Sequence, residues 1–394
     1  MQRQTEFDII VLGASGYTGR LVAQYLSEAY SGDSLRWAMA GRNLQKLEEV
    51  RTAINAPADT PLLIADTTDA ASLDELVKRT RVIITTVGPY QLYGSELVAA
   101  CARAGTDYVD LCGEPAWMRQ MIDAHEKTAQ DSGARIVFSC GFDSVPFDLG
   151  VLFLQQAARE RFGSPLPRVK TRVRQMKGTF SGGTAASLQA TLKAAQADPD
   201  IYKLLIDPFA LAPNFKGPKQ PRSDKPEYDE KLGSWLAPFM MAAINTRNIH
   251  RSNALLGHAY GEDFVYDEMV ITGPGEKGKA VAEAITNDRS LSSDKAPKPG
   301  EGPTAEEREN GFYDLLLIGE GSKGEELRVG VAGKRDPGYG STSRMIAESA
   351  LCLLRDATDT PGGIWTPAPA MGEKLIKRLE AHADLTFRLE DTPG

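Results

Sequence analysis

The sequence predicts an α/β protein in which a doubly wound parallel sheet is followed by a second, α+β domain with a mainly antiparallel sheet. Three observations carry this prediction. Short apolar runs alternate with helix-like stretches over the first 165 residues, a glycine-rich turn follows the first apolar run, and longer strand-like segments joined by loops come after residue 165. Alternating strands and helices are typical of parallel sheets, whereas successive strands favour antiparallel pairing.

The strands of the first sheet are expected where apolar residues run together. These runs are residues 7–12, 35–40, 62–65, 82–87, 108–111 and 136–139. Helix-like stretches lie between them, and Ser72 with Glu75 predicts a capping box for a helix over 73–79. Right-handed crossovers between six such strands give a doubly wound Rossmann sheet with the order 3-2-1-4-5-6.

The second half of the chain has a different pattern, with longer strand-like segments, helices and long loops. We expect strands at 168–180, 264–272, 312–319 and 325–333, helices at 184–196, 237–256 and 343–354, and loops at 212–235 and 286–310, the latter mobile. Pro238 is placed in the first turn of its helix, where a missing N–H is tolerated. The expected domains are residues 1–165, residues 166–339 for substrate and dimer contacts, and residues 340–394, which pack back on the first domain.

The composition argues against several classes of protein. The 394 residues include 45 Lys and Arg against 53 Asp and Glu, and this net charge of −8 does not indicate binding to nucleic acid. No apolar run is long enough for a membrane span, and the first residues show no secretory signal. Four scattered cysteines and four dispersed histidines indicate reduced thiols and no metal site. We therefore expect a cytoplasmic protein, and a homodimer by base rate.

A glycine-rich turn directly follows the first strand and opens the first helix. It consists of Gly13, Ala14, Ser15, Gly16, Tyr17, Thr18 and Gly19. Gly13 permits the tight turn, Gly16 lets backbone approach a pyrophosphate, and Gly19 allows close packing of helix on strand. Free N–H groups at the helix start suit phosphate. The turn predicts an NAD(P)-binding domain, and the alternative is a tight turn without a ligand.

Two residues beyond neighbouring strands bear on the choice of cofactor. Arg42 follows the second strand and cannot accept a hydrogen bond from a ribose hydroxyl, but its guanidinium suits a 2′-phosphate. This residue favours NADP, as NADPH, over NAD. Asp66 follows the third strand and is expected either to accept a hydrogen bond from adenine or to cap the next helix, with capping favoured.

The fourth and sixth strands are expected to end at the cofactor. In a doubly wound sheet, ligands bind beyond the carboxyl ends of the strands at the switch point. The backbone there should pass the ribose and nicotinamide at Val87, Gly88, Pro89, Cys140 and Gly141. Cys140 also has a purely structural interpretation, as a small core residue.

Three further side chains are expected to converge on the same cleft. They are Tyr90, Glu114 and Asp143, which follow the fourth, fifth and sixth strands. Each has a structural alternative: Tyr90 packs in the core, Glu114 caps a helix that begins at Pro115, and Asp143 holds a turn. Taken singly, the structural alternative is the commoner one.

The most apolar stretch of the second domain, residues 235–244, contains Phe239 and Met240. Such side chains adapt to irregular apolar ligands, so the stretch predicts an acyl-chain wall or a peripheral membrane contact; the alternative is a core or dimer helix. Arg247 and Arg251, with His250 between them, follow at helical spacing. They are expected to hold a phosphate or carboxylate, or else to form a solvated basic face.

Several segments together resemble the saccharopine dehydrogenase-like oxidoreductase family. They are GASGYTGRLVAQYL, AGRN, VGPYQLYG, YVDLCGE and CGFDSVPFDLG, and KRDPGYGSTSRMIAESALCLL and GGIWTPAPAMGEKLIKRL are similar to its branch of trans-acting enoyl reductases. The resemblance covers essentially the whole chain. It implies an NADP-type cofactor, a Rossmann domain completed by C-terminal segments, and a lipid-like or thioester-borne substrate. The cation cluster that saccharopine itself would require is not evident.

The leading hypothesis is an NADPH-dependent reductase of an activated double bond. Hydride would reach the β-carbon of an enoyl thioester, and an acid would protonate the α-carbon. Tyr90 is the candidate acid and Asp143 a candidate orienting group. The alternatives are reduction of C=O or C=N, and a non-catalytic protein that binds a dinucleotide and associates with lipid.

Overall fold

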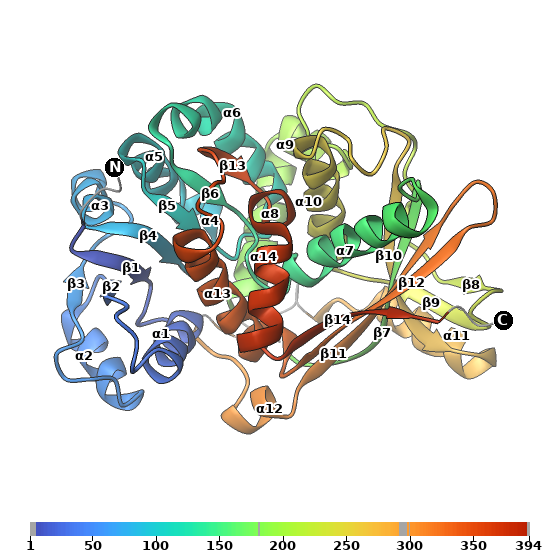
Figure 1. Cartoon of the computed structure of the whole chain (residues 1–394). Coiled ribbons are helices and arrows are strands. Elements are labelled where there is room, and N and C mark those ends of the chain that lie inside the picture. The colour runs from blue at the N-terminus through green and yellow to red at the C-terminus, as the bar shows by residue number, and fades with distance from the viewer. Residues whose placement is uncertain (1–4, 180–181, 291–297, 299, 392–394) are drawn as a thin grey trace.

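The computed structural model describes residues 5–179, 182–290, 298 and 300–391. In this part of the chain, two seven-stranded sheets lie side by side, and two helices of the C-terminal segment, α13 (Thr342–Arg355) and α14 (Pro367–His382), lie between them (Figure 1). The fold class predicted from the sequence is confirmed.

The first sheet is parallel and has the strand order β13-β6-β5-β4-β1-β2-β3. Its strands are β1 (Phe7–Leu12), β2 (Trp37–Gly41), β3 (Leu62–Ile64), β4 (Thr80–Thr85), β5 (Asp107–Val109), β6 (Arg135–Val137) and β13 (Gly363–Trp365). The expected order 3-2-1-4-5-6 is thus present, and β13 from the end of the chain extends it beside β6.

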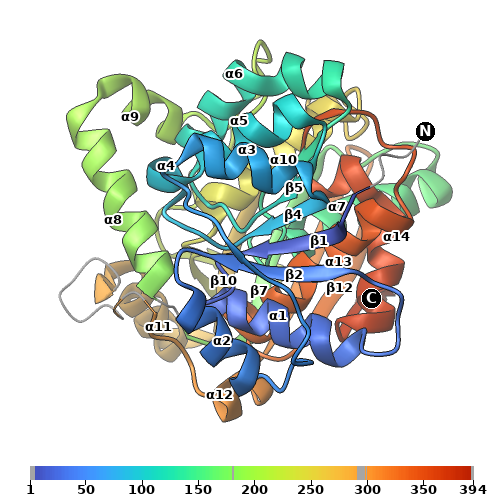
Figure 2. The ribbon, with the colours of Figure 1, turned by 90° about the vertical axis from the view of Figure 1, so that its left-hand side faces the viewer.

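Helices cover both faces of this sheet, as its apolar strands require. The helices of the first domain are α1 (Tyr17–Ala29), α2 (Leu44–Ala53), α3 (Ala70–Lys78), α4 (Tyr90–Tyr93), α5 (Ser95–Ala104) and α6 (Pro115–Ser132). Ile9 and Val11 point into one core with residues of α1 and α13, whereas Ile10 and Leu12 point into a second core with residues of α3, α5 and α6. Figure 2 shows these helices on opposite sides of the strands.

The start of α3 differs from the expectation. Asp69 is the N-cap, and its carboxylate accepts a hydrogen bond from Ala71 N at 3.0 Å. The predicted capping box at Ser72 is therefore wrong, because the helix begins one turn earlier, at an acid with the same capping ability. Asp66 does not cap this helix either: its Oδ1 accepts hydrogen bonds from the N–H and hydroxyl of Thr68.

The second sheet is mainly antiparallel, with the order β14-β12-β11-β7-β10-β9-β8. Its strands are β7 (Arg168–Lys177), β8 (Glu227–Asp229), β9 (Ser234–Pro238), β10 (Val265–Gly273), β11 (Phe312–Glu320), β12 (Glu326–Lys334) and β14 (Leu385–Glu390). Within this sheet, β7 and β10 form the only parallel pair among the described strands. Helix α7 (Val145–Phe162) leads from the first sheet into this one.

The predicted helix 237–256 is wrong at its start. Ala237 pairs with Val270 in the sheet, and the strand β9 ends at Pro238. Helix α10 spans Ala242–Leu255. Because proline lacks an N–H, it is tolerated at a strand end as well as in a first helical turn, and the sequence alone did not separate the two.

The two expected loops contain regular structure. Strand β8 lies within 212–235, and 286–310 contains α12 (Ala305–Glu309), which has a capping box between Thr304 and Glu307. Helices α8 (Gly182–Ala197), α9 (Pro199–Ile206) and α11 (Gly275–Asn287) complete the domain. Residues 291–297 and 299 of the second expected loop, and Phe180 of the strand expected at 168–180, lie outside the described residues.

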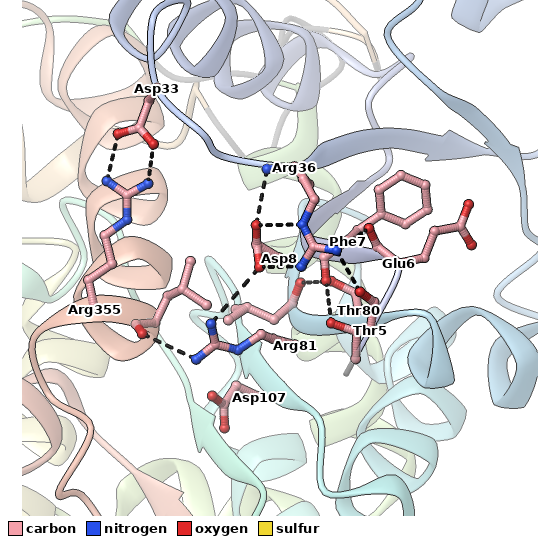
Figure 3. A network of polar contacts seen from close by, with 12 residues as sticks. Thr5, Glu6, Phe7, Asp8, Asp33, Arg36, Thr80, Arg81, Asp107 and Arg355 are labelled. Atoms are coloured by element: carbon pink, nitrogen blue, oxygen red, sulfur yellow. Dashed lines mark hydrogen bonds and ion pairs between the residues drawn. The ribbon is translucent and has the colours of Figure 1, made fainter. Parts of the chain in front are cut away.

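The C-terminal segment contributes to both sheets, through β13 and β14. Figure 3 shows how the end of α13 is fastened to the first domain: the Arg355 guanidinium donates two hydrogen bonds to the Asp33 carboxylate, at 2.9 and 2.8 Å. Arg81 on β4 donates to Leu354 O at 3.3 Å, and Asp8 on β1 pairs with Arg36. Helix α13 is thereby held against the parallel sheet.

Candidate functional site

A cavity of about 810 Å³ lies at the carboxyl ends of the parallel strands and continues into the second domain. Its first wall comes from the glycine-rich turn and from the loops that follow β2, β3, β4 and β6. Its second wall comes from α8, α9, the start of α10 and the segment Phe239 to Met241. One end of the cavity therefore meets the expected dinucleotide site, and the other is bounded by the second domain.

The glycine-rich turn has the predicted close packing. Gly13 has a φ of +87°, and Gly16 N donates a hydrogen bond to Gly13 O at 2.9 Å. A Cβ on Gly19 would lie 2.1 Å from Gly13 O, so only glycine fits there. Of the seven predicted residues, five line the cavity, and the other two, Ala14 and Gly19, pack behind it. The N-terminus of α1 thus faces a space of suitable size for a pyrophosphate.

Tyr17 joins this turn to the second domain. Its hydroxyl donates a hydrogen bond to Pro303 O, and the Arg308 guanidinium donates to the same hydroxyl at 2.8 Å. Its ring meets Tyr339 edge to face, with 5.0 Å between centroids. Glu301 in the same segment lines the cavity. Residues 300–308 therefore form a strap that crosses the cofactor end of the cavity.

Arg42 lies on the cavity wall beyond β2, beside Gly41 and Thr67. Asp66 lies outside the lining. The hydrogen bonds from Thr68 lower the pKa of Asp66, and the nearby charge of Arg42 adds to this effect. A cation thus stands where the second strand ends, at the position that the 2′-substituent of the adenosine ribose reaches in a doubly wound fold.

The loops after β4 and β6 meet as predicted. Val87, Gly88, Pro89 and Gly141 line the cavity. Cys140 does not: it is fully buried behind the wall, and burial raises the pKa of its thiol. This residue packs in the core, as the alternative interpretation held.

Tyr90 reaches the cavity, but its hydroxyl is engaged elsewhere. The hydroxyl donates to Thr85 O at 3.3 Å and accepts from Leu111 N at 3.0 Å, which ties the ends of β4 and β5 together. Burial raises the pKa of Tyr90 well above its ordinary value, and the charge of Asp110 adds to this. These contacts suit a positioning role better than proton donation.

Glu114 is 2% exposed and connects the two domains through hydrogen bonds. Its carboxylate accepts hydrogen bonds from Tyr90 N at 2.8 Å, from Gln91 N at 2.9 Å and from the Ser187 hydroxyl at 2.9 Å. It is the N-cap residue of α6, but its side chain does not cap that helix. The predicted cleft residue thus lies under the wall and holds α8 against α4.

Asp143 faces the cavity beside Gly141 and Phe142, and Glu301 is a second carboxylic acid of the lining. Its Oδ1 is buried and has no hydrogen-bond partner within the described ranges. Burial raises the pKa of Asp143 to about 7. The preceding turn is fixed by Asp110, whose Oδ1 accepts from Ser139 N at 2.8 Å and from Cys112 N at 3.0 Å. An acid that is half protonated near neutral pH is thereby held at the switch point.

The second wall is largely apolar. Phe239 and Met240 line the cavity as expected, and Met240 is 46% exposed. Ile244, the last residue of the predicted stretch, lines it too, whereas sequence reasoning missed Leu188 and Leu192 on α8 and Leu205 on α9. The stretch 235–244 is not a continuous exposed patch, because Leu236 and Ala237 are fully buried.

The two arginines of α10 lie in different surroundings. Arg247 lines the cavity, is 7% exposed, and donates hydrogen bonds to Ala243 O and Leu205 O; burial lowers its pKa to about 10. Arg251 does not reach the cavity: it donates to Leu211 O and pairs with Glu126 at 3.0 Å. His250 packs on Phe209. The expected solvated basic face therefore does not form, because Arg247, His250 and Arg251 are all buried.

Two searches of the described residues bear on other classes of site. No group of three or more His, Cys, Asp or Glu side chains in these ranges is arranged to hold a metal ion. None of the helices in the same ranges is both long enough and apolar enough to cross a membrane.

The doubly wound sheet, the glycine-rich turn and the adjoining cavity define a dinucleotide-dependent oxidoreductase. Residues 9–137 match the family model of the saccharopine dehydrogenase NADP binding domain. The chain is 43% identical to a candidate trans-acting enoyl reductase of Mycobacterium tuberculosis, over 95% of this chain and 96% of that protein. It is 38% identical to the trans-acting enoyl reductase of Mycobacterium ulcerans, with the same coverage. The chain therefore belongs to the saccharopine dehydrogenase-like oxidoreductases, in the branch that includes the trans-acting enoyl reductases.

Two solved structures share the fold. Apo saccharopine dehydrogenase from Saccharomyces cerevisiae matches with a TM-score of 0.55 and 12% identity, over 98% of this chain and 100% of that chain. Homospermidine synthase from Legionella pneumophila, solved with NAD, matches with a TM-score of 0.54 and 8% identity, over 98% of this chain and 92% of that chain. At such identities the likeness concerns the fold alone.

Proposed function

We propose that this oxidoreductase uses NADPH to reduce the activated double bond of an enoyl group carried by a lipid-like or thioester-borne substrate. The observation that carries the proposal is the continuity of the cavity. A single space runs from the glycine-rich turn, past Asp143, to the apolar wall of α8 and α10, and Oδ1 of Asp143 has no hydrogen-bond partner among the described residues. Relatives named trans-acting enoyl reductases support the same reaction class.

The residues at the first end fit an NADPH molecule. The N–H groups at the start of α1 would hold the pyrophosphate, and a Cβ at Gly13 would lie 2.8 Å from Val87 Cγ2, so the turn is shaped by close approach. Arg42 offers a guanidinium to the 2′-phosphate. When bound, the cofactor supplies the hydride; the preference for NADPH over NADH is part of the proposal.

Asp143 is the proposed proton donor, and Tyr90 the residue that holds the loop beside it. Hydride addition at the β-carbon leaves an enolate, and the α-carbon then needs a proton. The Tyr90 hydroxyl already donates its proton to Thr85 O. Burial raises the pKa of the Asp143 carboxyl to about 7, so about half of the molecules carry this proton at neutral pH, and its Oδ1 has no hydrogen-bond partner in the described ranges.

The apolar second wall is proposed to hold the chain of the substrate. Leu188, Leu192, Met240 and Ile244 offer a surface without a formal charge to an acyl group. Arg247, at the edge of this wall, is proposed to meet an anionic group of the carrier. A homodimer and a peripheral membrane contact stay predictions, which light scattering and sedimentation with liposomes would check.

The test is NADPH oxidation with a panel of enoyl, keto and imine substrates, the enoyl thioesters being offered with short and long chains. We expect turnover of enoyl thioesters, with a lower KM for longer chains. Asp143→Asn should lower kcat by about 10² to 10⁴ without changing the Kd for NADPH. Since the acid must be protonated, wild-type kcat should fall as the pH rises.

Glu326→Gln on β12 is the matched control, since it removes a carboxylate of the second domain that does not line the cavity. Turnover of only keto or imine compounds would assign the protein to the alternative reaction classes. Binding of NADPH without any turnover would favour the non-catalytic alternative.

A further inference from the structure

Behind the cavity wall, two asparagines of α10 connect the loop of Asp143 to the second sheet. Asn248 Nδ2 donates a hydrogen bond to the Ser144 hydroxyl at 2.8 Å, and Asn245 Nδ2 donates to Glu268 Oε2 at 2.9 Å. Both asparagines are fully buried, and they are three residues apart, so they lie on one side of the helix. Helix α10 therefore spans the distance between residues 143–144 and β10.

Three oxygen atoms of this cluster have no donor. They are Oδ1 of Asp143, Asn245 and Asn248, and each is buried without a hydrogen-bond partner in the part of the chain that the structure describes. A buried acceptor that lacks a donor costs about 1–3 kcal/mol. Buried polar groups of this kind commonly share an internal water, which can donate two hydrogen bonds. Each of the three oxygen atoms is therefore an acceptor that an internal water would satisfy.

Glu268 is the second carboxyl group of the cluster. It is fully buried, and the Tyr266 hydroxyl lies 2.8 Å from its Oε1 and 2.7 Å from the Thr171 hydroxyl on β7. Its neighbour Asp267 is turned away to Arg172 and Arg168.

The surroundings of Glu268 favour its protonated form. Burial raises its pKa to about 8, the donors Asn245 and Tyr266 oppose this, and the charges of Asp143 and Asp267 raise it further. The groups that act on it are thus two neutral donors and two acids, and among the described residues it forms no ion pair with a cation.

We propose that Glu268 stores the proton that returns Asp143 to its acid form, and that a water held by Asn245 and Asn248 carries it between the two carboxyl groups. This inference rests on the proposed role of Asp143. Glu268 acts through Asp143 and does not line the cavity, so it is a positioning residue. The established homology assigns it no role.

The proton balance is closed by solvent. Asp143 gives its proton to the α-carbon and becomes a carboxylate. The protonated Glu268 passes its proton through the water to Asp143, and the new Glu268 carboxylate is held by the hydrogen bonds of Asn245 and Tyr266. After product leaves, Asp143 returns this proton through the water to Glu268, and one proton from bulk water enters through the open cavity to the Asp143 carboxylate, which restores both acids. One hydride and one proton are consumed in each turnover.

The kinetic test compares the pH dependence of kcat in the wild type and in Glu268→Gln. In the wild type, kcat should stay high with rising pH until Asp143 and Glu268 have both lost their protons, near the pKa of about 8 of Glu268. In Glu268→Gln it should fall with Asp143 alone, near a pKa of about 7, so the alkaline limb should move down by about one pH unit. An alkaline limb that does not move would overturn the proposal.

Tyr266→Phe tests the sign independently and serves if Glu268→Gln does not fold. Loss of the Tyr266 donor should raise the pKa of Glu268 and move the limb upward, opposite to Glu268→Gln. Purely structural defects in the two variants would not shift the alkaline limb of the kcat profile in opposite directions. Glu326→Gln is again the matched control and should leave the limb in place.

An infrared titration of the carboxyl groups separates this proposal from the proposed function, because it needs no substrate. In Asp143→Asn, the midpoint of the Glu268 band should fall, since the charge of Asp143 is gone. A midpoint that stays where it is in the wild type refutes the coupling. A coupled pair in a protein that reduces no enoyl compound would instead refute the proposed reaction while the pair itself stands.

Discussion

The two walls of the cavity are built by different means. On the first wall, α1 buries seven of its 13 residues, and the glycine-rich turn packs backbone against backbone. On the second wall, α8 buries only Gly182 and Ala185 of its 16 residues, and α9 buries none. Figure 2 shows α8 and α9 at the edge of the molecule, beside α4. The cofactor wall is therefore rigid, and the substrate wall is held by a few polar contacts.

This difference suits the two ligands that we propose. A dinucleotide has one fixed shape, which a close-packed turn can match. An acyl chain varies in length and conformation, and a helix with few buried side chains can adapt to it. The hydrogen bond from the Ser187 hydroxyl to Glu114 and the hydrogen bond from Gln91 to the Thr191 hydroxyl at 3.2 Å are two of the polar contacts that join α8 to the first wall.

The largest expected effect comes from breaking the first wall with Gly19→Ala. The new Cβ would lie 2.1 Å from Gly13 O and 2.8 Å from Thr86 Oγ1, so the turn must open. Overpacking of this kind costs about 1–3 kcal/mol or more, and we expect NADPH affinity to fall about 100-fold in a calorimetric titration. Gly32→Ala is the control, because nothing lies within 4 Å of its Cβ. Unchanged affinity in Gly19→Ala would show that the wall is not rigid.

A smaller effect is expected from Arg42→Ala, which leaves the turn intact and removes one cation. A hydrogen bond to a charged group contributes about 1.5–3 kcal/mol, so NADPH affinity should fall about 10- to 100-fold while NADH affinity stays the same. Arg103→Ala on α5, an exposed arginine paired with Asp74, is the control. An equal loss for both cofactors would assign Arg42 a role in the turn and not at the 2′-phosphate.

The same contrast explains what could be predicted from the sequence. The bounds of β1 were predicted without error, because an apolar run and the Gly13 turn are local signals. The start of α10 was missed because Ala237 pairs with Val270 on a strand far along the chain. Glu114 was placed near the cleft, but its partner Ser187 comes from another domain, and no local pattern joins them. The second wall is defined by such distant contacts.

The smallest expected effect comes from loosening the second wall with Ser187→Ala. The variant removes one of the hydrogen bonds to Glu114, worth about 0.5–1.5 kcal/mol, so the amide protons of α8 should exchange about 2- to 10-fold faster. Gln189→Ala, exposed on the same helix, is the control. NADPH affinity should not change in Ser187→Ala, because the first wall is packed independently. If it falls together with the protection of α8, the two walls are coupled, and the strap of residues 300–308, whose Arg308 donates a hydrogen bond to the Tyr17 hydroxyl, is the contact through which cofactor binding would order the substrate wall.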